Sequence, residues 1–167
     1  NNLINKNSNT YKQGAKFSVV TMHRPSNVDD KSTLSDFVDF FNNTVSTKTL
    51  IMWPVHPRTQ KQLVQMGLWE SLEINKKVIM LNPLNYHEML KLNMEANVFF
   101  TDSGGLQEEC CVVGTPCITL RENTERPITL SKNGGVSILV GSDINKISKE
   151  FEAILDVKKS PKIPNLF

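Results

Sequence analysis

The sequence of 167 residues lacks several features that would assign it to a special class of proteins. It has no apolar run near the roughly 18 residues that a bilayer span requires. Residues 1–10 are polar and contain no apolar segment of the kind found in secretory signals. The 19 basic residues nearly balance the 17 acidic ones and are scattered along the chain, which argues against a nucleic-acid partner. These absences favour a soluble, cytoplasmic protein that binds neither membrane nor nucleic acid.

Cysteine is also scarce. The 3 cysteines are Cys110, Cys111 and Cys117, an odd number without the C-x-x-C pairs of a zinc site or the spread of a disulfide framework. We therefore expect small buried thiols in a reducing compartment, and no metal site.

Short apolar runs alternate with amphipathic segments along the rest of the chain. The runs predicted as strands are 17–22, 50–53, 78–81, 98–101, 117–120 and 136–140. Two helical stripes have apolar residues every three or four positions, namely Leu34, Phe37, Val38 and Phe41, then Ile144, Ile147, Phe151 and Ile154. This alternation predicts an α/β fold, a Rossmann-like doubly wound parallel sheet with helices on both faces.

Polar side chains follow the first two predicted strands. His23 and Arg24 come after the first, and His56 and Arg58 after the second. The carboxyl ends of parallel strands meet at one edge of the sheet, where such folds bind ligands. The two histidines should therefore converge there, and a functional role is about as well supported as a structural one.

The loop after the fourth predicted strand is the most informative. Ser103 is placed to cap a helix, and Gly104 and Gly105 leave its first N–H groups uncovered, so that a phosphate or diphosphate could bind there. The loop matches neither the Walker motif nor G-x-G-x-x-G, which disfavours ATP and NAD. Glu109, about one turn into the helix, could accept from the hydroxyls of a ribose or could simply face solvent.

The next loop, residues 121–127, contains two arginines and two glutamates. Arg126 could bind a phosphate through two parallel hydrogen bonds or pair with a neighbouring carboxylate, and composition does not decide between them.

Taken together, four motifs resemble the C-terminal domain of the non-hydrolysing UDP-N-acetylglucosamine 2-epimerases. They are H-R-x-x-N at 23–27, P-V-H-P at 54–57, D-S-G-G-x-Q-E-E at 102–109 and T-E-R-P at 124–127, within a match over about residues 16–143.

The resemblance implies a two-domain GT-B-like fold with the active site in the cleft between two Rossmann-like halves, of which this chain looks like one. Residues 1–15 would then be an interdomain linker or a frayed start, and 16–160 the C-terminal nucleotide-binding domain. Residues 161–167 would be a truncated tail that stops before the closing helix usual in the family.

The activity that the resemblance implies is the interconversion of UDP-N-acetylglucosamine and UDP-N-acetylmannosamine, a step typical of polysaccharide biosynthesis. UDP is eliminated to leave 2-acetamidoglucal and is then added back, with the opposite configuration at C2. No cofactor and no metal are implied.

The resemblance also implies roles for individual residues. Ser103, Gly104 and Gly105 would hold the diphosphate, Glu109 the ribose, and Arg126 the anionic end of the leaving group. The uracil would lie on the segment from Leu84 to Met89. His23 would be catalytic, beside the diphosphate and the reacting sugar, and Arg24 and His56 match positions where some bacterial members bind a second UDP-N-acetylglucosamine as activator.

Two positions depart from the family pattern, since Ser26 and Ile128 stand where glutamate is common. The carboxylates used for proton chemistry at C2 come mostly from the N-terminal domain, so that domain of the same parent protein is an expected partner and the isolated fragment should be inactive. Family members are generally homodimers.

Three other functions remain open. A hydrolysing UDP-N-acetylglucosamine 2-epimerase would have a similar nucleotide half, and so would the donor domain of a GT-B glycosyltransferase. A nucleotide-binding module without catalysis also fits the chain taken alone.

Overall fold

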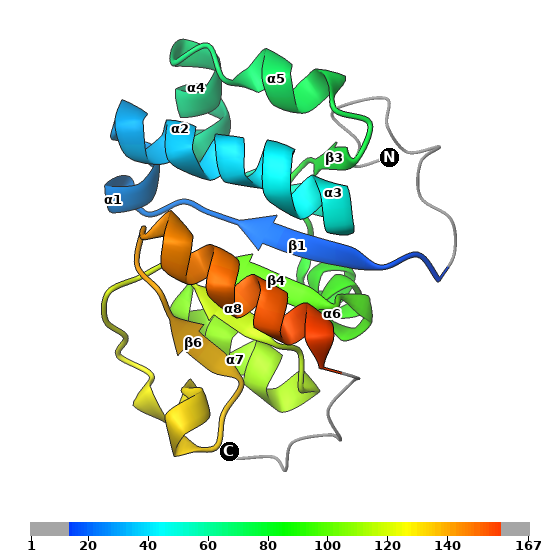
Figure 1. Ribbon diagram of the computed structural model, residues 1–167, viewed down its shortest axis with the longest axis vertical. Helices are drawn as coiled ribbons and strands as arrows, with labels where there is room; N and C mark the ends of the chain where they lie inside the picture. The colour runs from blue at the N-terminus through cyan, green and yellow to red at the C-terminus, as the bar shows by residue number, and fades with distance from the viewer. Residues whose placement is uncertain (1–13, 158–167) are drawn as a thin grey trace.

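A six-stranded, entirely parallel sheet forms the centre of the computed structural model, which describes residues 14–157 (Figure 1). Its strands are β1 (Phe17–Thr21), β2 (Leu50–Pro54), β3 (Val78–Leu81), β4 (Val98–Thr101), β5 (Cys117–Thr119) and β6 (Ser137–Leu139). Their order is β3-β2-β1-β4-β5-β6, which is that of a Rossmann-like doubly wound sheet. The predicted fold class is confirmed, and each predicted strand is present to within one residue at either end.

Helices cover both faces of this sheet. In Figure 1, α2 (Lys31–Phe40), α3 (Ser46–Lys48) and α8 (Ile144–Asp156) lie in front, and α6 (Tyr86–Glu95) and α7 (Gly104–Val113) lie behind. The other helical segments are α1 (Pro25–Val28), a π-helix (Phe41–Val45), α4 (Pro57–Gln65), α5 (Trp69–Ile74) and two 3-10 helices (Pro127–Thr129 and Ser131–Asn133). Both faces are thus closed to water, as the apolar strands require.

The larger apolar core lies between the sheet and the front helices. All four residues of the first predicted stripe, Leu34, Phe37, Val38 and Phe41, are buried there. Of the second stripe, Ile147 and Phe151 are buried, and Ile144 and Ile154 pack against the same core while partly exposed. Periodicity therefore identified correctly which helix faces turn inward.

The π-helix that follows α2 was not among the predicted elements. A π-turn inserts an extra residue into the helical ladder. Phe40 and Phe41, neighbours in sequence, both reach the core here: Phe40 packs edge-on against Phe151, and Phe41 against Trp53 with ring centroids 5.5 Å apart. Phe40, three residues beyond Phe37 on the same helix face, thus adds a buried aromatic ring to the predicted stripe.

Strands β1 and β4 are neighbours at the centre of the sheet, and they end at the same level. Thr21 is paired with Thr101, and their hydroxyl oxygens lie 2.8 Å apart. The loops that leave these two strands diverge to opposite faces, because the chain winds one way from β1 to β3 and the other way from β4 to β6. Ligands in such folds bind at this switch point.

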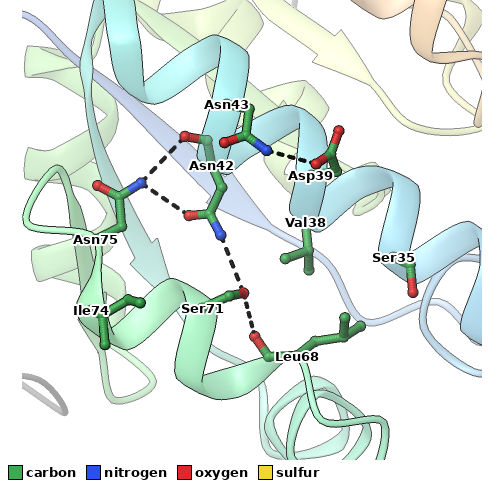
Figure 2. Close-up of a pocket in the computed structure, with 9 residues that line it drawn as sticks. All are labelled: Ser35, Val38, Asp39, Asn42, Asn43, Leu68, Ser71, Ile74 and Asn75. Carbon is green, nitrogen blue, oxygen red and sulfur yellow. Dashed lines mark hydrogen bonds between the residues drawn. The ribbon is translucent and has the colours of Figure 1, made fainter.

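A groove of about 560 Å³ lies elsewhere, between α2 with its π-helix and α5 (Figure 2). Its polar side chains bond one another: the Asn42 amide donates to Ser71, Asn75 donates to Asn42, and Asn43 donates to Asp39. These groups are satisfied within the fold, so the groove shows no set of polar groups that awaits a ligand.

Parts of the predicted domain layout lie outside the described residues. The predicted linker, 1–15, does so except for its last two residues, and the predicted tail, 161–167, does so entirely. No helix within residues 14–157 is both long and apolar enough to span a membrane.

The loop between β5 and β6 is closed by a tight contact at Gly135, which yields a first prediction. A Cβ atom at this position would lie 2.0 Å from the carbonyl oxygen of Thr129, so that the backbone would have to move. We expect Gly135→Ala to lower the free energy of unfolding by about 1–3 kcal/mol, as overpacking does elsewhere. Urea denaturation measures this. Lys132→Ala, at an exposed position of the same loop, is the control and should change little; equal stability of the two variants would contradict the contact.

Candidate functional site

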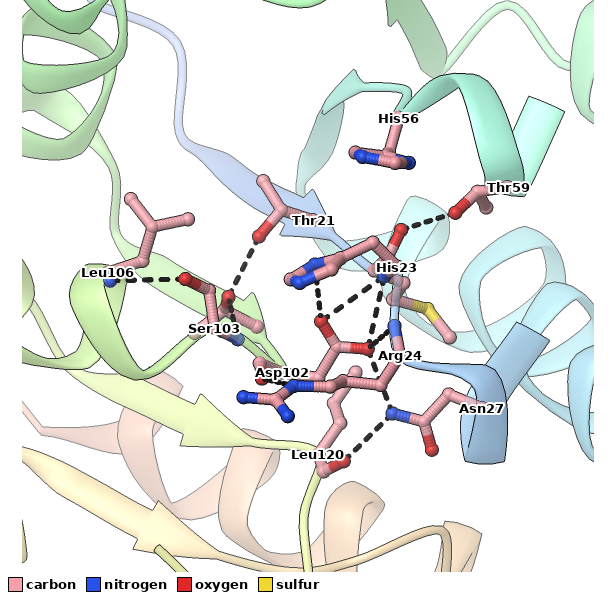
Figure 3. Close-up of polar contacts among 12 residues, drawn as sticks. Thr21, His23, Arg24, Asn27, His56, Thr59, Asp102, Ser103, Leu106 and Leu120 are labelled. Atoms are coloured by element: carbon pink, nitrogen blue, oxygen red, sulfur yellow. Dashed lines mark hydrogen bonds and ion pairs between the residues drawn. The ribbon is translucent and has the colours of Figure 1, made fainter. Parts of the chain in front are cut away.

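A buried carboxylate, Asp102, lies at the carboxyl end of β4 and organises the rim of the sheet (Figure 3). It accepts from the backbone N–H groups of His23 and Arg24, at 3.1 and 2.9 Å to Oδ2. The Asn27 side chain donates to the same oxygen at 3.0 Å and also to the Leu120 carbonyl at 2.9 Å. Asp102 and Asn27 together tie the loop after β1 to the ends of β4 and β5.

These contacts keep Asp102 ionised. Burial by itself would raise the pKa of its carboxyl group, but the hydrogen bonds from His23, Arg24 and Asn27 outweigh it and hold the pKa below the usual value. The site therefore contains a fixed negative charge out of contact with solvent.

His23 and His56 converge as predicted. His23 Nδ1 lies 3.0 Å from Asp102 Oδ1, and the centroids of the two imidazole rings are 5.4 Å apart. His56 caps α4, since its Nδ1 accepts from the Arg58 N–H at 3.1 Å. Burial, and then the charge of His23, lower the pKa of His56. Arg58 itself points to Asp29, with Nε 3.1 Å from Oδ1.

The N-terminus of α7 opens beside this pair. Ser103 is the N-cap, as predicted: its side chain accepts from the Leu106 N–H, and its own N–H donates to Thr101. Gly104 and Gly105 are the first two helical residues, and the first N–H groups of a helix have no acceptor within it. Backbone donors and the positive end of the helix dipole together form an anion-binding environment.

Arg126 lies over the start of α7. A Cβ on Gly104 would be 3.9 Å from Arg126 Cγ, and Arg126 Nε is 2.9 Å from Glu108 Oε1. Of the two roles considered for Arg126, pairing with a carboxylate is therefore present in this structure. Because only Nε makes that bond, the terminal amino groups of the guanidinium lie free of it.

Glu109 follows on the next turn of the same helix. Its Oε2 is buried and has no hydrogen-bond partner within the described part of the chain. Burial raises the pKa of this carboxyl group. A glutamate facing solvent would show neither feature, so the simple alternative for Glu109 is not what the structure contains.

Leu84 and Met89 flank the start of α6. Both are partly exposed, and Met89 also packs against the apolar core behind the sheet. Asn85 closes a capping box with Glu88 at this helix end. Since α6 and α7 pack side by side, Leu84, just before α6, and Met89, within it, lie near the start of the helix next to the one that contains Glu109.

Two residues of the site had no assigned role in the sequence interpretation. Asp102 and Asn27 stand in the quoted motifs, but nothing in the pattern marked them as partners. The available signal was the aspartate directly after the apolar run 98–101, because a charge that close to a buried strand needs hydrogen-bond donors. No cluster of three or more potential metal ligands is found among residues 14–157.

A second prediction concerns Asp102 and pH. Its lowered pKa in the folded state contributes stability that is complete above the unfolded-state pKa of about 3.9 and is lost as pH falls through the folded value. Asp102→Asn should therefore reduce the free energy of unfolding by about 1–3 kcal/mol near neutral pH, and the gap to the wild type should close as the solution is acidified. Urea denaturation across this range measures both. The exposed Asp36→Asn is the control; a pH-independent gap for Asp102→Asn would contradict the assignment.

Comparison with known proteins places this geometry in context. A family model described as UDP-N-acetylglucosamine 2-epimerase matches residues 1–166. The UDP-N-acetylglucosamine 2-epimerase of Methanocaldococcus jannaschii is 41% identical over 149 residues, which are 89% of this chain and 40% of that protein. The enzyme of the same name from Methanococcus maripaludis is 45% identical over 142 residues, covering 84% and 38%.

Comparison with solved structures shows the same similarity. The M. jannaschii enzyme in complex with UDP-GlcNAc and UDP superposes with a TM-score of 0.81 at 40% identity, over 90% of this chain and 41% of that one. The chain thus spans about two fifths of the length of these relatives, and its sheet corresponds to one Rossmann-like half of a GT-B-like architecture. By sequence and by fold, the chain belongs to the UDP-N-acetylglucosamine 2-epimerase family.

Proposed function

We propose that this chain is the UDP-binding half of an enzyme that interconverts UDP-N-acetylglucosamine and UDP-N-acetylmannosamine. In the forward direction the proton leaves C2, the C1–O bond breaks, and UDP departs with its electron pair to leave 2-acetamidoglucal. UDP then adds back at C1 while C2 is protonated on its opposite face. Family membership supports this reaction, as does the M. jannaschii relative whose structure holds UDP-GlcNAc and UDP.

The observation that carries the proposal is the unpaired, buried Oε2 of Glu109. An unsatisfied buried polar atom costs about 1–3 kcal/mol, and a ligand that donates to Glu109 would remove that cost. A ribose supplies two adjacent hydroxyl donors, which suit one carboxylate. Glu109 is 5 residues beyond the first residue of α7, which corresponds to about 7.5 Å along the helix axis. A ribose whose diphosphate rests on the helix N-terminus spans a distance of this order.

The diphosphate would rest on the N–H groups at the start of α7, beside Ser103, Gly104 and Gly105. Arg126 supplies the balancing charge. Its Nε bond to Glu108 orients the guanidinium, and the terminal amino groups can then bind phosphate oxygens in a fork. Pairing with Glu108 and binding of phosphate are in this way compatible roles for one arginine.

The base would lie on the neighbouring helix. The segment from Leu84 to Met89 offers partly exposed apolar surface from the start of α6, next to α7. A uracil ring extending from a ribose at Glu109 would pack there, which orders the three parts of UDP along one line.

His23 is the proposed catalytic group of this half. Expulsion of UDP places negative charge on phosphate oxygens, and a positioned imidazole beside a helix N-terminus stabilises that charge where it develops. Arg24 and His56 lie on the same rim and remain the proposed contacts of a second, activating UDP-N-acetylglucosamine.

The missing part of the enzyme belongs to the proposal as well. The cleft would be completed by an N-terminal domain of the same parent protein, which would supply the acid and base groups for C2. We place the intact enzyme in the cytoplasm, as a homodimer that serves polysaccharide biosynthesis. Residues 16–160 would be its C-terminal nucleotide-binding domain.

A direct test compares this chain with its full-length parent. The chain alone should bind UDP but form no UDP-N-acetylmannosamine from UDP-N-acetylglucosamine, whereas the parent should form it with little net release of free UDP. Nuclear magnetic resonance of the sugar nucleotides follows both products. Stoichiometric release of UDP by the parent would favour the hydrolysing alternative. If the parent formed neither product, the non-catalytic nucleotide-binding module would be favoured.

The ribose contact gives the sharpest prediction of affinity. Glu109→Gln should weaken UDP binding about tenfold or more, since it replaces charge-assisted hydrogen bonds with neutral ones. A 2′,3′-dideoxy-UDP analogue has no hydroxyl to donate, so the two proteins should bind it equally well. Titration calorimetry measures these affinities.

The matched control is Glu95→Gln, an exposed glutamate at the far end of α6. It should bind UDP like the wild type. If Glu109→Gln weakens binding of UDP and of the dideoxy analogue by the same factor, the ribose does not lie on Glu109.

A further inference from the structure

Asp102 cannot touch a ligand, because it is fully buried and its oxygens are already occupied. Oδ2 accepts from Arg24 N–H and the Asn27 amide, and Oδ1 lies 3.0 Å from His23 Nδ1. Any effect of Asp102 on chemistry at the rim must therefore pass through the groups that it holds. Of the two side chains bonded to its carboxylate, Asn27 is buried, whereas the His23 imidazole reaches solvent, with 38% of its side chain exposed.

The contact with Asp102 fixes where His23 carries a proton. Because Asp102 is ionised and can only accept, the His23 nitrogen facing it must be Nδ1–H. This holds whether the imidazole is neutral or protonated. Nε2 is left as the nitrogen of His23 that does not face Asp102, and it carries the lone pair when the ring is neutral.

His56 is held in the opposite state. A backbone N–H can only donate, so His56 Nδ1, which accepts from Arg58 N–H at 3.1 Å, must present a lone pair. Its proton therefore lies on Nε2, and protonation of Nδ1 would break the cap of α4. Burial and the neighbouring His23 lower the pKa of His56, and the cation of Arg58 acts in the same direction.

We propose that Asp102 is a positioning residue that fixes His23 as the Nδ1–H tautomer, while the cap of α4 fixes His56 as the Nε2–H tautomer. In the neutral pair, His23 Nε2 is then the ring nitrogen whose lone pair accepts no hydrogen bond within the described residues. In the epimerase reaction, on which this role rests, that nitrogen, when it carries a proton, donates to the phosphate oxygen as the C1–O bond breaks, and it accepts the proton back when the bond re-forms.

The two charged groups beside the pair fit this division. Asp102, on the β4 side, presents a carboxylate oxygen to His23 Nδ1 at 3.0 Å. On the α4 side, burial, the charge of His23 and the cation of Arg58 lower the pKa of His56, while Asp102 acts in the opposite direction. Arg24 Nε donates to the Asp102 carbonyl at 3.3 Å. Two adjacent histidines are in this way given different hydrogen-bond partners, and so different tautomers, by their surroundings.

Long-range ¹H–¹⁵N correlation spectra of this chain test the proposal without any measurement of activity. At a pH high enough to keep the 3 histidines neutral, His23 should show Nδ1–H and His56 should show Nε2–H. The reverse tautomer at His23, or identical tautomers at both, would overturn the proposal in the wild-type protein alone.

Asp102→Asn should invert the tautomer of His23. The asparagine oxygen is held at the Oδ2 position by the donors from Arg24 and Asn27, so its amide group replaces Oδ1 and donates to His23 Nδ1. His23 must then move its proton to Nε2, while His56 stays unchanged. An unchanged His23 tautomer in this variant would show that Asp102 does not set it.

Asn27→Ala is the matched control. It removes another donor from Asp102 without touching the His23 contact, so it should lower stability and leave both tautomers as in the wild type. Were it to change the His23 tautomer as Asp102→Asn does, the effect would be general loosening of the loop, and the proposal would fail.

Added UDP separates this proposal from the proposed function. If UDP binds, the ¹⁵N signal of His23 Nε2 should shift more than that of His56 in the wild type, and the shift should be lost in Asp102→Asn. A larger shift at His56 would overturn the role given to His23. If UDP does not bind the wild type, the proposed function fails, while the tautomers measured without UDP still decide the role of Asp102.

Discussion

One buried negative charge, that of Asp102, determines how the rim of this sheet is built. Placing a carboxylate where no water reaches it is costly unless donors surround it, and here the donors come from the loop after β1. Asn27 extends the same network to the Leu120 carbonyl beyond β5. The loops around the switch point therefore cannot shift independently, and His23 and the N-terminus of α7 keep a fixed relation to each other.

The rest of the site uses this fixed frame. Ser103 directly follows Asp102, so the charge that anchors the β1 loop also sets where α7 begins. Arg126 reaches the start of α7 from the loop after β5, and its bond with Glu108 fixes that approach. Glu109 lies further along the same helix, and its buried Oε2 has no hydrogen-bond partner within the described residues. In the proposed function, this arrangement orders the contacts for diphosphate, ribose and uracil along two adjacent helices.

The fold could be predicted from the sequence because the hydrophobic pattern that specifies it is local. Apolar runs of strand length and helical stripes such as that from Leu34 to Phe41 depend on residues close together in the chain, and the sheet contains them where predicted. Convergence of His23 and His56 also followed, since parallel strands end at one edge. The π-helix could not be predicted, because no local pattern in the sequence marks where a helix takes up an extra residue. The partners of Asp102 were missed because its contact with the His23 N–H joins positions 79 residues apart. The choice of Glu108 as partner for Arg126 likewise depends on the loop after β5 meeting helix α7 in space.

The position of a nucleotide on this rim is the feature on which the proposed function depends most, and crystals of the chain grown with UDP measure it directly. Difference density should place the diphosphate at the N–H groups of Gly104 and Gly105, both ribose hydroxyls within hydrogen-bond distance of the Glu109 carboxylate, and the uracil against the segment from Leu84 to Met89. Density for UDP in the groove between α2 and α5, or with its ribose turned away from Glu109, would contradict the account.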